Sequence, residues 1–294
     1  MVCIKVPATS ANVGVGFDTL GLAVTFYGEC EVELSDKLEI AGCPVEFQTE
    51  DNLIYQSYKY VLDDLKRPVT PIKLQIDSDI PFARGLGSSA VCIVSGVLAA
   101  NELHQLHLSQ DDLVKYCTKI EGHPDNVVPA LLGGLSASYQ MDDDIFFQHY
   151  PVDESYQFVA FVPDFTLETS VARGVLPESY PLKTVVANQA KLLFLLDALK
   201  TGDAANLDKF LDDGIHQPYR KKLIDEYDIV EHIAKESGAK GFYISGSGST
   251  LMGIFTSQVD MKGLNTSLST LKHKWKALDL LVDYKGAEVC HRTI

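Results

Sequence analysis

The stretch Gly85-Leu86-Gly87-Ser88-Ser89-Ala90 marks a change of hydrophobic period, and it decides how the rest of the chain is interpreted. Before it, Ile72, Leu74 and Ile76 alternate with polar residues, which predicts a strand. After it, apolar residues recur at the spacing of a helix buried on one side: Ala90, Ile93, Val94, Val97 and Leu98. The stretch is therefore a tight connection from a strand into a helix.

This connection has the properties of an anion site. Gly85 and Gly87 let the backbone approach a ligand closely, and the first amides of the helix have no partner within it. The helix dipole favours a polyphosphate there, and the hydroxyls of Ser88 and Ser89 can add donors or reach a magnesium ion. From the loop alone, an anion site and a tightly packed turn of small residues are both open.

Two better-known phosphate loops fit less well. A Walker A loop would need Gly-Lys-Ser/Thr at a fixed spacing, which is absent here. The stretch does match the G-x-G-x-x-A of dinucleotide-binding folds, but that pattern requires a second strand with an acid about 20 residues later. Residues 100–121 look helical instead.

Composition limits the class of protein. With 294 residues and 46% apolar content, the chain can bury one large or two medium cores, and we favour two. A formal net charge of -15 argues against nucleic acid or an anionic membrane surface as the main partner. The six cysteines show no zinc-like spacing, and no apolar run approaches a membrane span. We therefore expect reduced thiols and a cytoplasmic location.

The order of predicted elements indicates an α+β protein. Residues 1–80 look rich in strands, and a helix begins after Ser109, whose N-cap pattern includes Asp112, and ends near Gly122. Beyond this part we expect strands at 158–162, 241–245 and 250–255 and helices near 187–200, 203–213 and 226–237. These elements predict two domains, 1–152 and 153–294.

Two further clusters of small and polar residues have ligand-binding capacity. Pro7-Ala8-Thr9-Ser10-Ala11-Asn12-Val13-Gly14-Val15-Gly16-Phe17-Asp18 forms either a polar binding loop or a capped turn. Gly246-Ser247-Gly248-Ser249-Thr250, taken alone, predicts a hairpin turn between paired strands. A run of leucines packs either the core or a dimer interface: Leu192, Leu193, Leu195, Leu196 and Leu199.

Together, and in this order, the three clusters resemble the motifs of the GHMP kinases, named for galactokinase, homoserine kinase, mevalonate kinase and phosphomevalonate kinase. The resemblance covers essentially the whole chain. Two of the stretches, Pro7 to Asp18 and Arg84 to Ala90, and the segment Glu121-Gly122-His123-Pro124-Asp125-Asn126-Val127 look most like those of the homoserine kinases. The resemblance implies a two-domain fold, ribosomal-protein-S5-domain-2-like at the N-terminus and ferredoxin-like at the C-terminus. It implies transfer of the ATP γ-phosphate to L-homoserine in threonine biosynthesis.

The resemblance also implies which residues bind ATP and magnesium. Ser89 and Glu121 would be the protein ligands of Mg²⁺, which needs only one or two such ligands because it keeps several waters. Asn52 resembles a position that contacts adenine. The residues implied at the ATP site are Pro81, Phe82, Ala83, Arg84, Gly85, Leu86, Gly87, Ser88, Ser89, Ala90 and Asn52.

For the acceptor, the resemblance implies a site that recognises an amino acid. Asp18 would meet the ammonium group, and Arg173 and Arg220 would clamp the carboxylate, since a guanidinium can pair with two carboxylate oxygens at once. The implied acceptor-site residues are Asn12, Asp18, His123, Asn126, Thr169, Arg173, Arg220 and Gly246.

The implied catalytic residues are Asn12, Asn126, Ser89 and Glu121. Asn126 stands where some relatives place an Asp, and an amide cannot take a proton at neutral pH. Asp125 is expected to point away from the site. The hydroxyl proton would then pass to a phosphate oxygen, with catalysis by positioning and charge neutralisation. A kinase for mevalonate or a sugar, and a non-catalytic metabolite sensor, are the alternatives.

Overall fold

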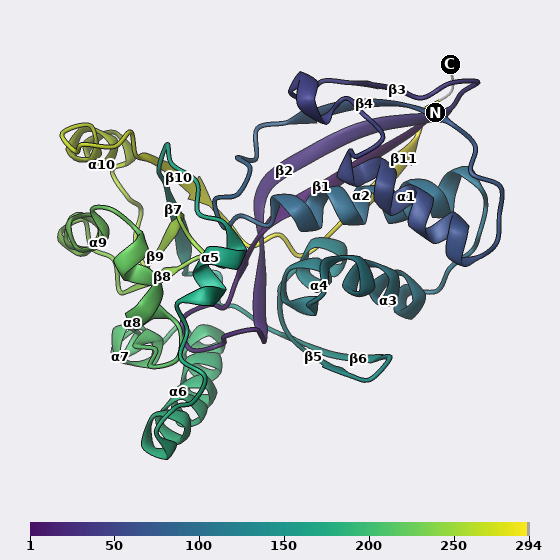
Figure 1. Cartoon of the computed structure of the whole chain (residues 1–294). Helices are drawn as coiled ribbons and strands as arrows, with labels where there is room; N and C mark the ends of the chain where they lie inside the picture. Colours follow the sequence, from purple (N-terminus) through teal and green to yellow (C-terminus); the bar gives the residue numbers. More distant parts are fainter. Residues whose placement is uncertain (293–294) are drawn as a thin grey trace.

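The computed structural model describes residues 1–292, which form two halves joined side by side (Figure 1). The first half contains a seven-stranded sheet in which β11, β1, β2, β4 and β3 follow one another and β5 pairs with both β2 and β6. Its strands are β1 (Val2–Ala11), β2 (Leu20–Leu34), β3 (Glu39–Ala41), β4 (Ile72–Ser78), β5 (Leu135–Met141), β6 (Asp144–Tyr150) and β11 (Glu288–His291). Val2 therefore lies opposite His291, because β11 pairs antiparallel with β1.

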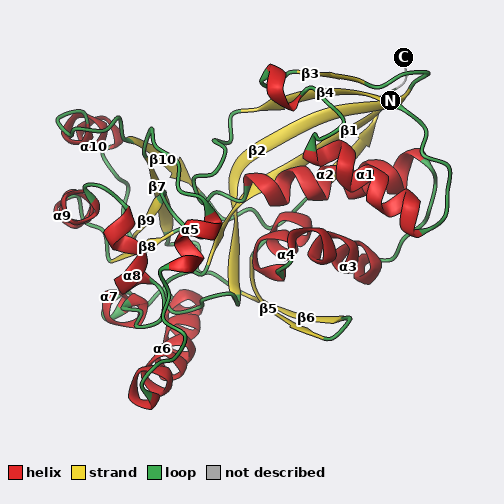
Figure 2. Ribbon diagram, viewed as in Figure 1, coloured by secondary structure: helices red, strands yellow, loops and turns green. Residues whose placement is uncertain are grey.

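The helices of the first half pack over the part of this sheet formed by β1 and β2 (Figure 2). They are α1 (Leu53–Asp64), α2 (Ser88–Leu103), α3 (Gln110–Glu121) and α4 (Pro124–Leu132), with a short 3-10 helix at Val45–Phe47. The helices α2 and α4 contact β1 and β2, and α1 and α3 pack on α2. This arrangement places the beginnings of α2 and α4 beside the strand that carries the early polar loop.

The second half is built on a four-stranded sheet in the order β10-β7-β9-β8. Its strands are β7 (Gln157–Val162), β8 (Gly241–Ile244), β9 (Leu251–Phe255) and β10 (Lys276–Leu280). Its helices are α5 (Thr169–Gly174), α6 (Leu182–Thr201), α7 (Leu207–Leu211), α8 (Gln217–Arg220), α9 (Tyr227–Glu236) and α10 (Met261–Leu268), with a 3-10 helix at Lys221–Leu223. None of the helices between residues 1 and 292 is both long and apolar enough to cross a membrane.

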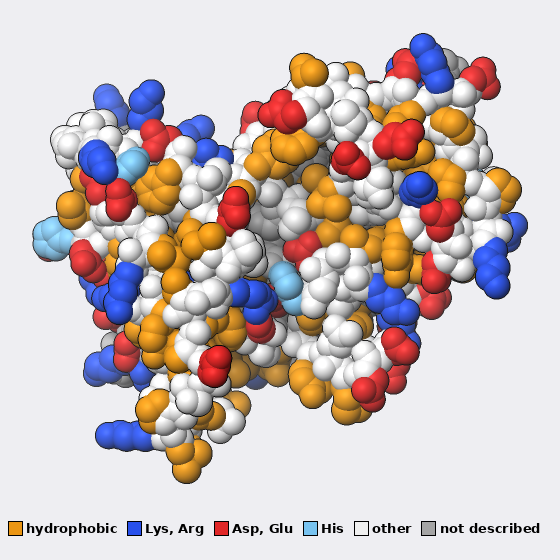
Figure 3. Space-filling view, viewed as in Figure 1, with side chains coloured by type: hydrophobic (Ala, Val, Ile, Leu, Met, Phe, Trp, Pro, Cys, Tyr) orange, Lys and Arg blue, Asp and Glu red, His pale blue; other side chains and the backbone are white. Residues whose placement is uncertain are grey.

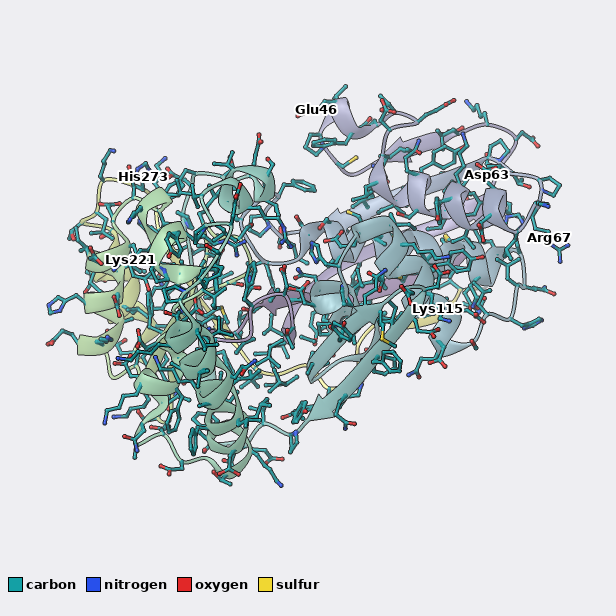
Figure 4. The ribbon with its side chains drawn as sticks, turned by 60° about the horizontal axis from the view of Figure 1, so that its bottom comes forward. Glu46, Asp63, Arg67, Lys115, Lys221 and His273 are labelled. Atoms are coloured by element: carbon teal, nitrogen blue, oxygen red, sulfur yellow. The ribbon has the colours of Figure 1, made fainter. Side chains whose placement is uncertain are left out.

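The larger of two hydrophobic clusters extends across both halves. Phe158 and Ala160 of β7 belong to the large cluster that also contains β1, β2 and α2, whereas Val159 and Phe161 belong to a smaller cluster on the other face of the sheet. Because side chains alternate along a strand, β7 is buried on both faces. Figure 4 labels charged side chains at the surface of both halves, among them Lys221 on the second half and Arg67 and Lys115 on the first.

One prediction for residues 1–80 is wrong in part. The strands β1, β2 and β4 are present, but residues 53–64 form the helix α1, with Asn52 as its N-cap. The predicted helix after Ser109 is confirmed, and Ser109 and Asp112 form a capping box. The boundary at 152 and 153 stays a prediction, while the last strand, β11, belongs to the first sheet.

Candidate active site

The glycine loop is held tightly between two other segments. Gly87, with φ of 66°, is the N-cap of α2, and a Cβ there would lie 2.0 Å from Oγ1 of Thr9. A Cβ on Gly85, with φ of 78°, would lie 2.2 Å from the carbonyl oxygen of Ser245. Both positions therefore require glycine, and no side chain caps the N-terminus of α2. The open first turn of this helix is suited to bind a phosphate.

Backbone hydrogen bonds join the three predicted clusters. The amide of Thr9 donates to the carbonyl of Leu86 at 3.2 Å, and the amide of Gly246 donates to the carbonyl of Ala11 at 3.0 Å. The amide of Thr250 donates to the carbonyl of Arg84 at 3.0 Å. The Gly246 segment is a hairpin turn between β8 and β9, as its sequence predicts, and it also forms one wall of the site.

An apolar cavity of about 320 Å³ adjoins the loop on one side. Its walls include Phe47 and Phe82, whose ring centroids lie 5.6 Å apart. It shares Ser88 and Ser89 with a second, polar cavity, which is also lined by Asn12, Asp18, Asp125, Arg173 and Arg220. Asn52 also lines it, but its Oδ1 accepts from the amides that begin α1 and its Nδ2 donates to the carbonyl of Phe47 at 2.9 Å. The Asn52 amide is thus engaged by the protein itself.

Some residues of the implied ATP site contribute structure rather than walls. Pro81, Arg84, Leu86 and Ala90 line neither of these two cavities. The Arg84 guanidinium donates to the carbonyls of Pro163 and Asp164, each at 3.0 Å, which fastens the loop to the second half. Leu86 and Ala90 are buried in the core.

A carboxylate faces the start of α2. The hydroxyl of Ser89 donates to Oε1 of Glu121 at 2.7 Å, and Glu121 is the last residue of α3. Burial raises the pKa of Glu121, while the hydrogen bond from Ser89 opposes this effect. The pair brings one hydroxyl and one acid to the N-terminal end of α2.

The segment after Glu121 supplies a second acid that the sequence analysis missed. Asp125 lines the polar cavity, and Nδ1 of His123 lies 2.6 Å from its Oδ1. Burial lowers the pKa of His123, but the hydrogen bond and charge of Asp125 outweigh burial and raise it overall. The expectation that Asp125 points away is therefore wrong, because the first turn of α4 turns it inward. Asn126 accepts a hydrogen bond from the hydroxyl of Thr9 at 2.8 Å.

The early polar loop forms the far wall of the polar cavity. Asn12, which is buried and has φ of 71°, donates from Nδ2 to the carbonyl of Gly246 at 2.7 Å and accepts from the amide of Asp18 at 2.9 Å. The Asn12 side chain thereby fixes the backbone that carries Asp18. Thr169 also lines this cavity, with its hydroxyl 3.4 Å from that of Ser247.

Both predicted arginines reach this one cavity. Arg173 pairs with Asp18 through two contacts, Nη1 to Oδ2 at 2.8 Å and Nη2 to Oδ1 at 2.9 Å. Arg220 is 1% exposed, and burial lowers its pKa to about 10. In Figure 3, acidic, basic and histidine side chains gather around the hollow between the two halves. The cavity therefore offers both signs of charge to a small ligand beside the glycine loop.

Comparison with known proteins gives matches over the whole chain. The model of the GHMP kinases N terminal domain matches residues 52–134, and that of the GHMP kinases C terminal domain matches residues 195–264. A homoserine kinase of Clostridium botulinum (strain 657 / Type Ba4) is 39% identical over 298 residues, which is 100% of both chains.

Solved structures agree with these matches. The crystal structure of homoserine kinase from Cytophaga hutchinsonii superimposes with a TM-score of 0.86 at 28% identity, covering 98% of this chain and 97% of the other. The mevalonate kinase of L. major shares the fold, with a TM-score of 0.74 at 16% identity over 95% of this chain and 94% of the other.

Proposed function

The chain belongs to the GHMP kinase family and, within it, to the homoserine kinases, and from this we propose that it transfers the γ-phosphate of ATP to the side-chain hydroxyl of L-homoserine. The observation that carries the proposal is the meeting of Asp18, Arg173 and Arg220 around one cavity that opens onto the glycine loop. The product would be O-phospho-L-homoserine, and cytoplasmic threonine biosynthesis is the setting that this product implies.

For ATP, the apolar cavity and the start of α2 offer two adjoining subsites. The adenine would lie in the cavity walled by Phe47 and Phe82, whose aromatic faces suit a planar base. The phosphates would lie against the first-turn amides of α2, where Ser88 and Ser89 line both cavities. Asn52 would support this site by capping α1 more than by hydrogen bonding to the base.

The residues at the loop fit a magnesium ion that travels with ATP. Ser89 and Glu121 would hold it, since one hydroxyl and one carboxylate suffice for an ion that takes its other ligands from water and phosphate. Within residues 1–292 there is no group of three or more His, Cys, Asp or Glu that could form a closed metal site. When bound, Mg²⁺ supplies positive charge that neutralises the phosphate oxygens.

The acceptor would enter by exchanging partners with an existing ion pair. Asp18 and Arg173 form an ion pair with each other. A zwitterion can replace that one ion pair by two, with its ammonium group on Asp18 and its carboxylate on Arg173 and Arg220. This exchange keeps every charge paired. It selects amino acids over neutral alcohols, because a neutral acceptor has no charged groups to pair with Asp18 and Arg173.

Transfer would then depend on orientation. Asn12 and Asn126 would orient the hydroxyl, and the phosphoryl group would move in line from ATP. Asp125 is the one acid beside Asn126 in the cavity wall, but its Oδ1 is engaged by His123. We therefore assign Asp125 to holding His123 and keep the proton transfer to a phosphate oxygen.

A panel of acceptors tests the proposal through release of ADP. With ATP and Mg²⁺, L-homoserine is expected to be turned over with the highest kcat/KM. Faster turnover of mevalonate or a sugar would indicate a GHMP kinase for another metabolite. ATP binding with no ADP release for any acceptor would indicate a non-catalytic relative.

We also propose that the enzyme forms a homodimer through α6. Of the leucine run on this helix, Leu195 and Leu199 are buried in the core, whereas Leu193 is 70% exposed. Phe194 beside it is 59% exposed, and α6 projects from the second half (Figure 1). Several exposed apolar side chains on one helix, here also Leu182 and Val186, are typical of an interaction surface. Light scattering should give twice the mass of one chain for the wild type and a single-chain mass for Phe194→Glu; a wild-type monomer would refute the dimer.

A further inference from the structure

Arg220 is buried, yet it is only partly engaged by the protein. Its Nε donates to the carbonyl of Ala172 at 3.1 Å, and its Nη1 donates to the carbonyl of Gly246 at 2.9 Å. Among the described residues these contacts leave Nη2 free, and Arg220 lines the polar cavity. A guanidinium held in this way has a fixed direction, so whatever fixes it also fixes the carboxylate clamp.

His216 contacts Arg220 from outside the polar cavity. The atoms around its ring determine which ring nitrogen carries the proton. Nε2 is 3.0 Å from the carbonyl oxygen of Gly14 and 3.6 Å from Oδ2 of Asp213. Both of these oxygens are acceptors, so Nε2 carries the hydrogen. Nδ1 faces Nη1 of Arg220 at 3.5 Å, and a guanidinium only donates, so Nδ1 is unprotonated. The ring is therefore neutral, with its proton on Nε2.

Burial agrees with a neutral ring. His216 is fully buried, and this lowers its pKa although the charge of Asp213 acts in the opposite direction. Asp213 serves mainly the backbone, because its Oδ2 accepts from the amides of His216 at 2.7 Å and Gln217 at 2.8 Å. Its Oδ1 accepts from Nδ2 of Asn188 on α6 at 2.6 Å. The carboxylate thus anchors the segment that presents the imidazole.

The same imidazole also contacts the early polar loop. Phe17 stacks on His216 with ring centroids 5.2 Å apart at an angle of 24°. Phe17, which directly precedes Asp18, also contacts Arg220: the guanidinium carbon lies 5.1 Å from the centre of the Phe17 ring. The His216 side chain therefore connects the loop that carries Asp18 with Arg220.

We propose that His216 is a positioning residue of the acceptor site. By donating to Gly14 and accepting from Arg220, the neutral imidazole fixes the separation between Asp18 and the Arg220 guanidinium. This separation sets which distance between ammonium and carboxylate the enzyme accepts. The inference rests on the proposed function and extends it to a residue that does not line the cavity.

His216→Phe tests this role, because it keeps a ring against Phe17 and removes both hydrogen bonds. The KM for L-homoserine should rise about tenfold or more, since small misplacements of a binding group have large effects on turnover. The KM for ATP should change less than about twofold, and kcat/KM for 3-aminopropan-1-ol, which lacks the carboxylate, should fall less than about threefold.

His104→Phe is the matched control. His104 is also a histidine against an aromatic ring, 5.6 Å from Tyr58 between centroids, but it follows the far end of α2. It should leave the preference for homoserine over 3-aminopropan-1-ol unchanged. An unchanged preference in His216→Phe as well would overturn the proposal, whatever happens to its melting temperature.

Two further readouts keep the outcomes separate. If His216→Phe does not fold, His216→Gln, which can retain the donor to Gly14, is measured instead, and it too must lose preference for homoserine. If the wild type does not phosphorylate homoserine, the proposed function fails. If the wild type does so and the variants keep its preference, only the role of His216 fails.

Discussion

Replacing Arg173 by methionine separates the loss of a surface ion pair from the loss of a substrate clamp. Arg173 and Asp18 are joined by two contacts, but their side chains are 40% and 36% exposed. Water screens such pairs, so the fold should lose at most about 1 kcal/mol. A substrate carboxylate that loses a charge-assisted hydrogen-bonded partner should lose about 1.5–3 kcal/mol of binding, which is roughly a 10- to 150-fold fall in kcat/KM for homoserine.

The assay measures initial rates of ADP release against homoserine and against ATP, together with a thermal melt of each variant. Lys115→Met is the control, because Lys115 is also 40% exposed and pairs with Asp144 at 3.0 Å, on the outer surface of the first half (Figure 4). Lys115→Met should leave kcat/KM for homoserine and for ATP unchanged. An equal fall for Arg173→Met with 3-aminopropan-1-ol would refute the clamp, since that acceptor has no carboxylate to lose.

Three further predictions concern the loop and the acid beside it. Gly87→Ala should raise the KM for ATP and lower the melting temperature, because a Cβ would lie 2.0 Å from Oγ1 of Thr9 at a positive φ; unchanged ATP kinetics would contradict the phosphate site. Asp125→Asn should lower kcat less than about tenfold, whereas loss of a true general base costs about 10²–10⁴. The raised pKa of His123 means that its pairing stabilises the fold below about pH 6.5 and is lost as pH rises through the folded-state pKa. The melting temperature of His123→Gln should therefore differ more from that of wild type at about pH 5.5 than at about pH 9, and a gap that grows with pH would show the sign to be wrong.

Local sequence pattern is sufficient to predict α2 and α3, the two helices that carry Ser89 and Glu121. The capping box at Ser109 and the apolar period after Gly87 each act within a few residues, so they are legible in sequence. The strand pattern of residues 1–80 does not indicate the helix α1, and the resemblance of Asn52 to an adenine contact directs attention away from its role as an N-cap. Its side chain accepts from the amides of Ile54 and Tyr55, which is the N-cap pattern that could have revealed the helix.

Contacts between distant residues could not be predicted from local pattern. The hydrogen bond from Thr9 to Asn126 joins residues 117 positions apart, and the ion pair of Arg173 with Asp18 spans 155 positions. The inward direction of Asp125 depends on how α4 packs against β1 and β2, which no neighbouring residue in sequence indicates. Family resemblance supplied the candidate residues, and the fold supplied their partners.

Identifying the product tests the central claim most directly. After incubation of the enzyme with ATP, Mg²⁺ and L-homoserine, phosphorus NMR should show the γ-phosphate signal of ATP replaced by that of a phosphomonoester. Coupling to the adjacent methylene protons should split the new signal into a triplet, as expected for phosphate on the side-chain oxygen of homoserine. Inorganic phosphate alone, or an unchanged ATP spectrum, would contradict the claim.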